Sequence, residues 1–195
     1  MTGNGQGAPM QPVEQDMQTA AQVVAFWNEA GPAKWFARDD AFDARFRALF
    51  LEEHHAAAAR AREHWLSTAE GALALMLLLD QFPRNCFRGT AHSYATDGLA
   101  RHYAMRAVEE GLDLELLPKL RAFIYLPFEH SEELQDQDRS VAMFDVLGDK
   151  QYLQFAELHR DIIRRFGRFP HRNAVLGRMT TMEEMDFLAE GGFAG

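Results

Sequence analysis

An unbroken apolar run, residues 72–79, constrains the fold of this 195-residue chain more than any other feature. A helix that is apolar on every side must be surrounded by other elements, because no face of it can meet water without cost. Ser67, followed three residues later by Glu70, predicts a capping box at the start of this helix, and Pro83 predicts its end. We therefore expect a central helix with the rest of the chain packed around it.

The other periodic segments are also helical in pattern. Apolar residues recur three and four positions apart, between capping residues, glycines and prolines. The predicted helices cover residues 14–30, 39–59, 90–110, 118–126, 131–147 and 149–166, with a short last helix opened by Thr180 and Glu183. Strand alternation is absent. We therefore predict an all-α fold of about eight helices in antiparallel hairpins, as a single domain over residues 13–195 after a flexible tail, residues 1–12.

Composition and charge argue against several functions. A formal net charge of −9 disfavours nucleic acid as a partner, because duplex binding depends on many Lys and Arg contacts to phosphates. The longest apolar run is far shorter than the roughly 20 residues that span a bilayer, so we expect no membrane partner. A single cysteine, Cys86, leaves no intramolecular disulfide and fits the cytoplasm. The sequence predicts no particular oligomeric state.

Polar side chains interrupt the apolar faces of two predicted helices. Gln137 lies four residues before Val141 on the apolar face of helix 131–147, and His130 lies on the same side at the start of that helix. His159 lies within the apolar face of helix 149–166. Buried polar groups require hydrogen-bond partners. Each of these residues is therefore either a structural hydrogen-bonding residue or part of a polar site.

Asp80 follows the apolar run at the carboxyl end of the central helix. The helix dipole and the free carbonyl groups disfavour an anion at this position. A buried carboxylate is costly unless it is paired, so we expect a cationic partner from Arg84, Arg88 or the arginine-rich segment 160–178. The pair is either a structural clamp or part of a catalytic site.

Two loops repeat one pattern. Residues 82–85 read Phe-Pro-Arg-Asn, and residues 169–173 read Phe-Pro-His-Arg-Asn, each directly after a predicted helix. Proline stops the helix, phenylalanine anchors the loop and asparagine tolerates the turn, which leaves arginine on a rigid base. If the two loops face one another, their arginines would bind a carboxylate or phosphate, because guanidinium pairs with both bidentately. Alternatively, each arginine binds only free helix carbonyls.

Signals for metals and organic cofactors are weak. Phosphate-binding glycine loops and dinucleotide fingerprints are absent, so we predict no cofactor. His54 and His55 lack the His–Glu spacing of a zinc helix, and no metal site is predicted there. A divalent ion near His130, His159 and His171 stays an open alternative. Cys86 is interpreted as a small apolar filler.

The strings FW at 26–27, KWF at 34–36, LALMLLLDQFPRNCFRG at 73–89, YLPFEHSE at 125–132 and FGRFPHRNAVLGR at 166–178 resemble the bacterial family known as domain of unknown function 924. The resemblance spans about residues 23–188 and implies a cytosolic, tetratricopeptide-like helical superhelix. The motifs of the family carry over onto Asp80, Gln81, Arg84, Asn85, Arg88, His130, Ser131, Glu132, Gln137, His159, Arg168, His171, Arg172 and Asn173.

Three functions remain open at this stage. In the first, a site for a small anionic molecule has catalytic residues and ligand-binding residues, and it supports a hydrolytic or acid–base reaction. The catalytic set is His130, His159, Asp80 and Glu132, and the ligand-binding set is Arg84, Asn85, Arg88, Gln81, Gln137, Arg168, His171, Arg172 and Asn173. In the second, the helical array is an interaction module for an acidic peptide or protein. In the third, the polar residues only lock the helices together.

Overall fold

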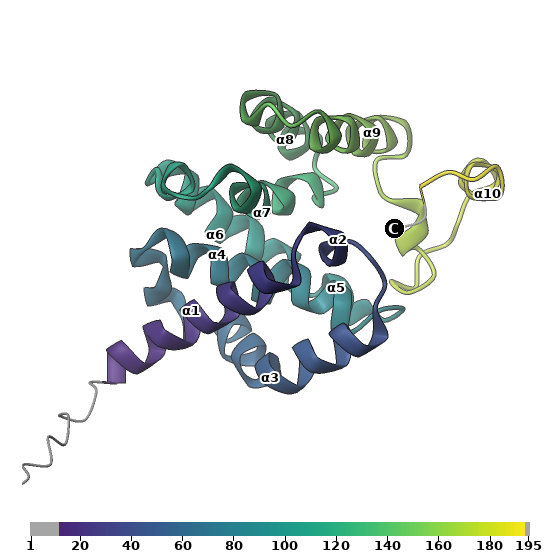
Figure 1. Cartoon of the computed structure of the whole chain (residues 1–195). Coiled ribbons are helices and arrows are strands. Elements are labelled where there is room, and N and C mark those ends of the chain that lie inside the picture. The colour runs from purple at the N-terminus through teal and green to yellow at the C-terminus, as the bar shows by residue number, and fades with distance from the viewer. Residues whose placement is uncertain (1–11, 194–195) are drawn as a thin grey trace, which may run out of the picture.

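The computed structural model describes residues 12–193, and every regular element in that range is helical (Figure 1). The α-helices are α1 (Pro12–Ala30), α2 (Pro32–Trp35), α3 (Asp40–Ala58), α4 (Ala69–Met76), α5 (Phe82–Cys86), α6 (Asp97–Glu109), α7 (Pro118–Glu129), α8 (Leu134–Leu147), α9 (Lys150–Phe166) and α10 (Met182–Ala189). Eight of these have eight residues or more, and the predicted all-α class is confirmed. The tetratricopeptide-like arrangement stays a prediction. The predicted tail lies outside the described residues except for Pro12, which begins α1.

The first five residues of the apolar run, 72–76, form most of α4, and the last three lie in the turn that follows it. Helix α4 lies at the centre of the molecule. It packs against α1, α6 and α7, and seven of its eight residues are buried. Its start is held by the side chain of Thr68, which accepts a hydrogen bond from the backbone N–H of Gly71. The predicted capping box of Ser67 and Glu70 is therefore wrong: Thr68 is the cap, and Gly71 stands where a box would need Glu or Gln. At Gly71 a Cβ atom would clash with the carbonyl oxygen of Trp65, so a glycine is needed where the preceding 3₁₀ turn η1 (Glu63–Ser67) meets α4.

Aromatic rings fill the space between α1, α3 and α7. Trp27 and Trp35 stack with their ring centroids 6.4 Å apart, and the ring of Phe123 meets both edge-on. The indole N–H of Trp35 donates to the carbonyl oxygen of Trp27 at 2.7 Å. Burying an aromatic side chain of this size removes about 150–250 Å² of surface from water. This packing attaches the amino-terminal helices to the central core.

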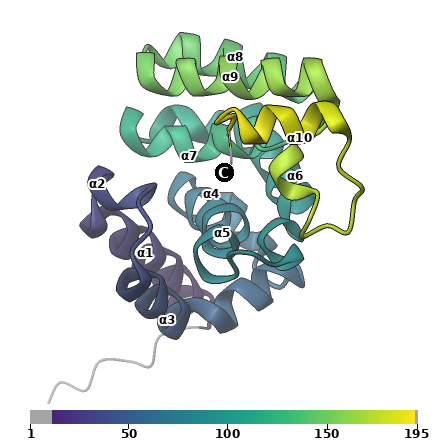
Figure 2. The same cartoon turned by 90° about the vertical axis from the view of Figure 1, so that its right-hand side faces the viewer.

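The carboxyl-terminal half adds a second layer. Figures 1 and 2 show α8 and α9 side by side over α7, with α10 beside the end of this layer. Gly148 and Gly167 end α8 and α9 in the left-handed conformation, as predicted for both positions. Ile162, Ile163 and Phe169 form a small separate core under α10. The loop after α9 is thereby anchored between α9 and α10.

Three predicted helix starts differ from the structure. The helix predicted from Thr90 begins with a 3₁₀ turn, η3 (Ala91–Tyr94), and α6 starts only at Asp97. The helix predicted from residue 131 starts at Leu134. The last helix has its capping box at Thr181 and Glu184, one position after the predicted pair. Local turn geometry decides which of two neighbouring polar residues becomes the cap, and residue identity alone does not.

Pro83 and Pro127 do not end helices, although the sequence predicts that the central helix ends at Pro83 and that the helix from residue 118 ends at residue 126. Pro127 lies inside α7, which continues to Glu129. At Pro83 the central helix widens into a π-helical turn, η2 (Leu77–Gln81), and continues as α5. Proline lacks an N–H group and clashes with the carbonyl group four residues earlier, and the wider turn relieves both problems. Asp80 and Gln81 therefore lie within a continuous helical rod.

The π-helical turn releases backbone carbonyl groups for side chains. The oxygen of Leu79 has no helical partner at Pro83, and it accepts a hydrogen bond from the Thr96 hydroxyl at 2.5 Å. The N–H of Phe82 bonds to the oxygen of Leu77, so the oxygen of Leu78 accepts instead from His54 Nδ1 at 2.9 Å. A buried carbonyl group that accepts no hydrogen bond would destabilise the fold, so these two bonds matter for stability. The turn thus connects the central rod to α3 and to the start of α6.

Candidate functional site

The two Phe-Pro segments meet at one carboxylate, although the first of them is the helix α5 and not the predicted loop. Arg84, from α5, donates two hydrogen bonds to Asp97, at 2.8 and 3.0 Å. Arg172, from the second loop, donates to the same carboxylate at 3.3 Å. The predicted approach of the two loops is confirmed by these contacts. We call Asp80, Arg84, Asp97, His130 and Arg172 the polar network.

Asp80 lies at the inner end of the polar network and is 1% exposed. Its carboxylate accepts from His130 Nδ1 at 2.8 Å, from Arg84 Nη1 at 3.0 Å and from Gln81 Nε2 at 2.6 Å. Burial opposes ionisation, but the charge of Arg84 and the contact with His130 lower the pKa of Asp80 to about 2. The predicted cationic partner of Asp80 is therefore Arg84.

His130 connects this inner carboxylate to the surface. It ends α7, and its side chain is 15% exposed. Burial and the nearby Arg84 cation lower the pKa of His130, while Asp80 opposes that shift. The neutral imidazole donates its Nδ1 proton to the carboxylate of Asp80, which leaves Nε2 with a lone pair. This is the arrangement of a general base that a carboxylate orients.

A second histidine lies behind His130, with the two ring centroids 6.5 Å apart. His159 Nδ1 donates to the carbonyl oxygen of Phe155 at 2.7 Å and lies 3.4 Å from the carboxyl oxygen of Glu129. Burial lowers the pKa of His159 to about 3. Burial and the charge of Asp80 raise the pKa of Glu129 to about 8. Near neutral pH this region therefore holds a neutral imidazole beside a protonated carboxyl group.

Arg172 is the least neutralised cation of the polar network. Its guanidinium lies 4.4 Å from the ring centroid of Phe169 and 4.5 Å from that of Tyr94, which fixes its plane. Its single bond to Asp97 is donated by Nη1, and its buried Nε atom has no hydrogen-bond partner among the described residues. Burial and the neighbouring Arg84 lower the pKa of Arg172 to about 10. A buried cation with an unused N–H group favours a further anion.

Glu132 fastens the second loop. It pairs with Arg178 through two hydrogen bonds, at 2.7 and 3.0 Å, and accepts the backbone N–H of Phe169 at 2.8 Å. Although burial opposes ionisation, these contacts lower the pKa of Glu132. The side chain is thus a fixed anion, and its predicted catalytic role stays a prediction.

Several predicted site residues bind other partners. Asn85 and Arg88 both contact the carboxylate of Asp43 on α3, at 2.7 and 3.0 Å. Gln137 donates to the carbonyl oxygens of Glu129 and Ser131, both at 2.6 Å. These residues hold helix ends and loops in place around the polar network.

The remaining predicted residues lie nearer the carboxyl end. Arg168 and Asn173 bind Glu184 of α10, and Arg168 does so through two hydrogen bonds at 2.6 and 2.9 Å. His171 packs its ring between Phe169 and Phe193, and burial lowers its pKa to about 4. A ligand-binding role for these residues stays a prediction.

Sequence reasoning missed the shared acidic partners. Asp97, Asp43 and Glu184 each bind two predicted site residues, but none belongs to a recognisable motif. Asp97 lies at the start of α6, where an acidic residue also suits the helix dipole, so its position has an ordinary explanation. The one signal in the sequence is the large number of arginines near the two Phe-Pro segments, because buried arginines need carboxylate partners.

Glu184 offers a first test of this arrangement. Glu184→Gln is expected to open α10, because the amide has one acceptor oxygen and cannot accept from Arg168 at both positions while it also accepts from the backbone N–H of Thr181. Hydrogen–deuterium exchange should become faster over residues 179–189 while α8 keeps its protection. Glu183→Gln is the control, since Glu183 forms only an exposed pair with Arg165. Equal exchange rates in the two variants would contradict the role of Glu184 in holding α10 in place.

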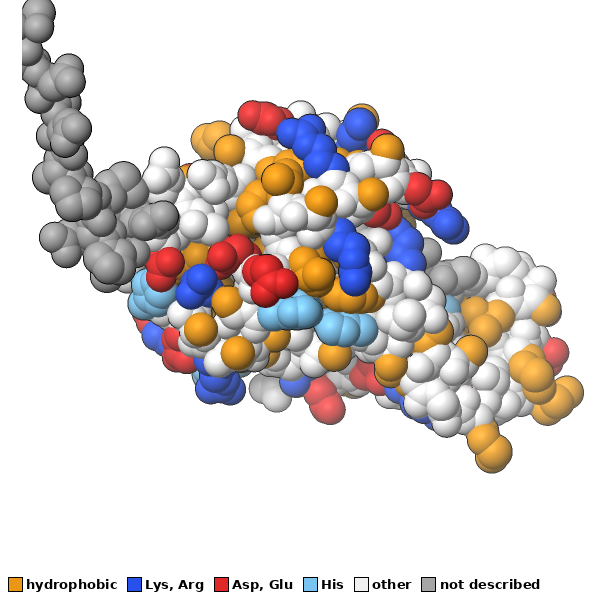
Figure 3. All heavy atoms as spheres, turned by 90° about the horizontal axis from the view of Figure 1, so that it is seen from below, with side chains coloured by type: hydrophobic (Ala, Val, Ile, Leu, Met, Phe, Trp, Pro, Cys, Tyr) orange, Lys and Arg blue, Asp and Glu red, His pale blue; other side chains and the backbone are white. Residues whose placement is uncertain are grey.

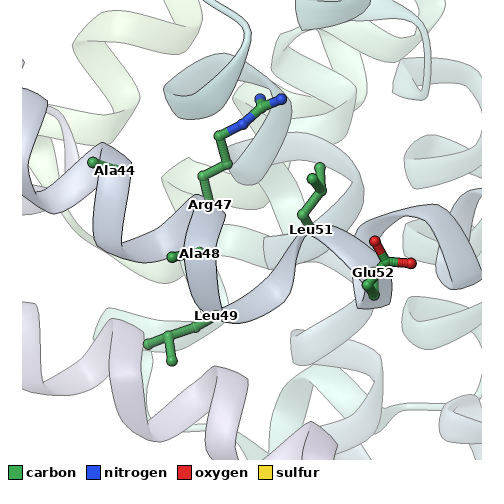
Figure 4. Close-up of a pocket in the computed structure, with 6 residues that line it drawn as sticks. All are labelled: Ala44, Arg47, Ala48, Leu49, Leu51 and Glu52. Carbon is green, nitrogen blue, oxygen red and sulfur yellow. The ribbon is translucent and has the colours of Figure 1, made fainter.

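Hollows in the surface lie away from the polar network. One of about 380 Å³ follows α3, and Figure 4 shows its lining residues on this single helix. Another of about 460 Å³ lies between η1, α6 and the first half of α1, at Met17. Within residues 12–193, no three His, Cys, Asp or Glu side chains form a group arranged for a metal ion, so the alternative at His130, His159 and His171 gains no support. None of the helices in that range is long and apolar enough to cross a membrane.

The fold and the polar network define an all-helical protein in which Arg84 and Arg172 share the carboxylate of Asp97, beside a buried Asp80–His130 pair. Residues 23–192 match the model of the family described as bacterial protein of unknown function DUF924, and the chain belongs to this family. It is similar to a solved structure of a protein of unknown function, ATU0120, from Agrobacterium tumefaciens. The identity is 54%, the match covers 90% of this chain and 99% of that one, and the TM-score is 0.88. No curated protein matches the chain.

Proposed function

We propose that the protein binds a small carboxylate or phosphate compound beside Arg172, and that His130 transfers a proton in a hydrolytic or acid–base reaction that needs no organic cofactor. The observation that carries this proposal is the hydrogen bond between Asp80 and His130 Nδ1, at 2.8 Å. A carboxylate that is 1% exposed fixes the tautomer and the direction of a partly exposed imidazole. Such pairs are found where histidine acts as a general base.

The anion-binding half of the proposal depends on Arg172. Arg84 is already neutralised by Asp80 and Asp97, whereas Arg172 has a single, longer bond to Asp97. The unused Nε donor of Arg172 matches one oxygen of a carboxylate or phosphate group. An anion there would lie in the same network as His130, joined through Asp97 and Arg84.

A thermal-shift screen against phosphates, small carboxylates and acidic peptides tests the proposal. A ligand at 100 times its Kd adds about 2.7 kcal/mol, which raises Tm by roughly 5–10 °C in a chain of this size. Arg172→Met keeps an unbranched apolar side chain but removes the guanidinium that lies over Phe169, and it should abolish the shift. Arg164→Met is the matched control, because Arg164 is half exposed and pairs with Asp138 on the surface of α8. An equal shift in both variants would remove Arg172 from the site.

Arg172→Met also distinguishes a ligand site from a network that is purely structural. If Arg172 serves mainly to bind a ligand, Arg172→Met without ligand should leave stability nearly unchanged or increased. A loss of about 3 kcal/mol or more would favour a network that only locks the helices together. Turnover of the ligand by the native protein, lost in His130→Asn, would then test the catalytic half.

An interaction module is the second candidate function, and a specific surface favours it. Met179, Met182 and Met185 are 89%, 70% and 44% exposed along one side of α10 and the loop before it. Exposed methionines suit adaptable protein contacts. In that case the protein would act through a partner chain in the cytoplasm, and the screen above would give no shift with small anions.

A further inference from the structure

The chain turns back on itself directly after α10. Gly191 has a φ of +84°, in the left-handed region, and its N–H donates to the carbonyl oxygen of Leu188, while the N–H of Gly192 donates to that of Phe187. These two bonds form a Schellman turn at the end of the helix. A Cβ atom at Gly192 would clash with the oxygen and the ring of Phe187, so glycine is needed there. Figure 2 shows the chain after α10 turning toward the middle of that view.

Phe193 follows this turn and packs against two histidines of the candidate site. Its ring centroid lies 4.4 Å from that of His159 and 5.3 Å from that of His171, and both pairs of rings meet edge to face. The ring of His159 in turn lies 6.5 Å from that of His130, and His171 directly precedes Arg172 in the chain. The segment after α10 therefore touches the immediate surroundings of the proposed base and of the proposed anion-binding residue.

Burial keeps both of these histidines neutral. His159 is 5% exposed, and burial lowers its pKa to about 3. Burial likewise lowers the pKa of His171 to about 4, and the charge of Arg172 acts in the same direction on both rings. Because the ring of Phe193 lies against both imidazoles, it supplies part of this burial. Movement of Phe193 away from them would expose the two rings to water.

The segment after α10 is held mainly by ring contacts. Among the described residues, Phe193 forms no hydrogen bond, and it is a partly buried member of the small core under α10. Residues 190–191 are exposed. Helix α10 itself packs on η5 (Pro170–Arg172) and projects from the other helices at one edge of the molecule (Figures 1 and 3). A segment with few buried contacts opens locally at a low cost in free energy.

Ligand access to Arg172 requires such a movement. Arg172 is 5% exposed and its Nε atom is buried, so a ligand reaches that atom only if a neighbouring segment moves. We propose that residues 190–193 form a hinged lid on the candidate site, with Gly191 and Gly192 as the hinge and Phe193 as the ring that closes it. A small carboxylate or phosphate compound would enter while the lid is open, and closure would exclude water and strengthen its contact with the cation. The inference rests on the proposed function for its ligand, whereas the motion is measurable without one.

Acylation of histidine by diethyl pyrocarbonate, followed by mass spectrometry, measures the opening of the lid. In the native protein near pH 7 we expect His159 to react slowly, at a rate that low urea concentrations hardly change, because local opening exposes little surface. Phe193→Ala, which removes the ring, and Gly192→Ala, which disrupts the turn, should each raise this rate by about tenfold or more. Phe166→Leu is the control, because Phe166 belongs to the same small core and packs on Phe187. The exposed His102 should react equally in all variants.

Three results would overturn the lid. The first is a native rate at His159 that rises with urea as steeply as global unfolding does. The second is an unchanged rate in Phe193→Ala that circular dichroism shows to be folded. The third is inorganic phosphate that raises Tm through Arg172 but does not slow the acylation of His159. If phosphate does not bind at all, the proposed function loses support, while the rates measured without phosphate still decide whether the lid opens.

Discussion

Asp80→Asn is expected to reduce the free energy of unfolding by about 3 kcal/mol. Asparagine has nearly the same volume, so the effect comes from lost charge and not from a cavity. Arg84 would lose one of the two carboxylates that it binds. If the asparagine directs its oxygen to His130, its NH₂ group faces the NH₂ group of Gln81, and two donors then meet without an acceptor. Removing one partner of a buried pair typically costs about 3–5 kcal/mol. Urea unfolding, followed by tryptophan fluorescence, measures the change.

Asp43→Asn provides the matched control. Asp43 also binds an arginine and an amide, but its partner Arg88 is 40% exposed and water can replace part of the contact. Exposed pairs contribute about 0–1 kcal/mol, so the control should lose much less stability. Similar losses in the two variants would mean that burial at Asp80 does not strengthen its contacts, and the account of the polar network would be wrong.

Glu129→Gln is expected to make the protein more stable than the native chain, by an amount that grows with pH. The folded state raises the pKa of Glu129 from about 4.5 to about 8. Below pH 4.5 the carboxyl group is protonated in both states and the native protein keeps its full stability. Between pH 4.5 and about 8 only the unfolded state loses the proton, so the free energy of unfolding of the native protein falls as pH rises. The fall ends once the folded state also loses its proton, above about pH 8. Above about pH 8 the variant should exceed the native protein in free energy of unfolding by roughly 4 to 5 kcal/mol.

Urea unfolding at several pH values between 5 and 9 measures this difference for the native protein and the variant. Glu132→Gln is the control with the opposite sign, because contacts with Arg178 and the backbone of Phe169 lower the pKa of Glu132. That variant should be less stable than the native protein at neutral pH, and the deficit should shrink as pH falls below the ordinary range of glutamate. A pH-independent effect of Glu129→Gln would show that the carboxyl group ionises freely in the folded protein.

Much of the fold is predictable because burial and helix punctuation are local signals. The apolar run at 72–79 is the central helix, and Gly148 and Gly167 end helices where expected. Pro83 misleads for a physical reason. The carbonyl group that it frees can find another partner, and Thr96 supplies that partner for Leu79 from 17 residues away. Such rescue depends on tertiary structure, which local patterns do not contain.

The candidate site is predictable only in part, again for a physical reason. The polar positions at Asp80, His130 and His159 stand out because each interrupts an apolar face. Their partners do not stand out, since Asp97 has an ordinary place at a helix start and Glu129 sits in an apolar stretch. Asn85 and Arg88 share a motif with Arg84 but turn toward α3. Neighbours in sequence on a helix point in different directions, so a shared motif does not imply a shared ligand.

The π-helical turn takes up one residue more than an ordinary α-helical turn does, because its hydrogen bonds join residues five apart and not four. Deleting one residue between Leu77 and Gln81 would therefore let an α-helix form while the parts on either side keep nearly the same orientation. The same deletion in α4, where no extra residue is stored, would rotate everything beyond it by about 100°, and Arg84 would leave Asp97. The turn thus makes this short segment the one place in the central rod where a change in length is tolerated, although the carbonyl groups that now bind Thr96 and His54 would lose their present geometry.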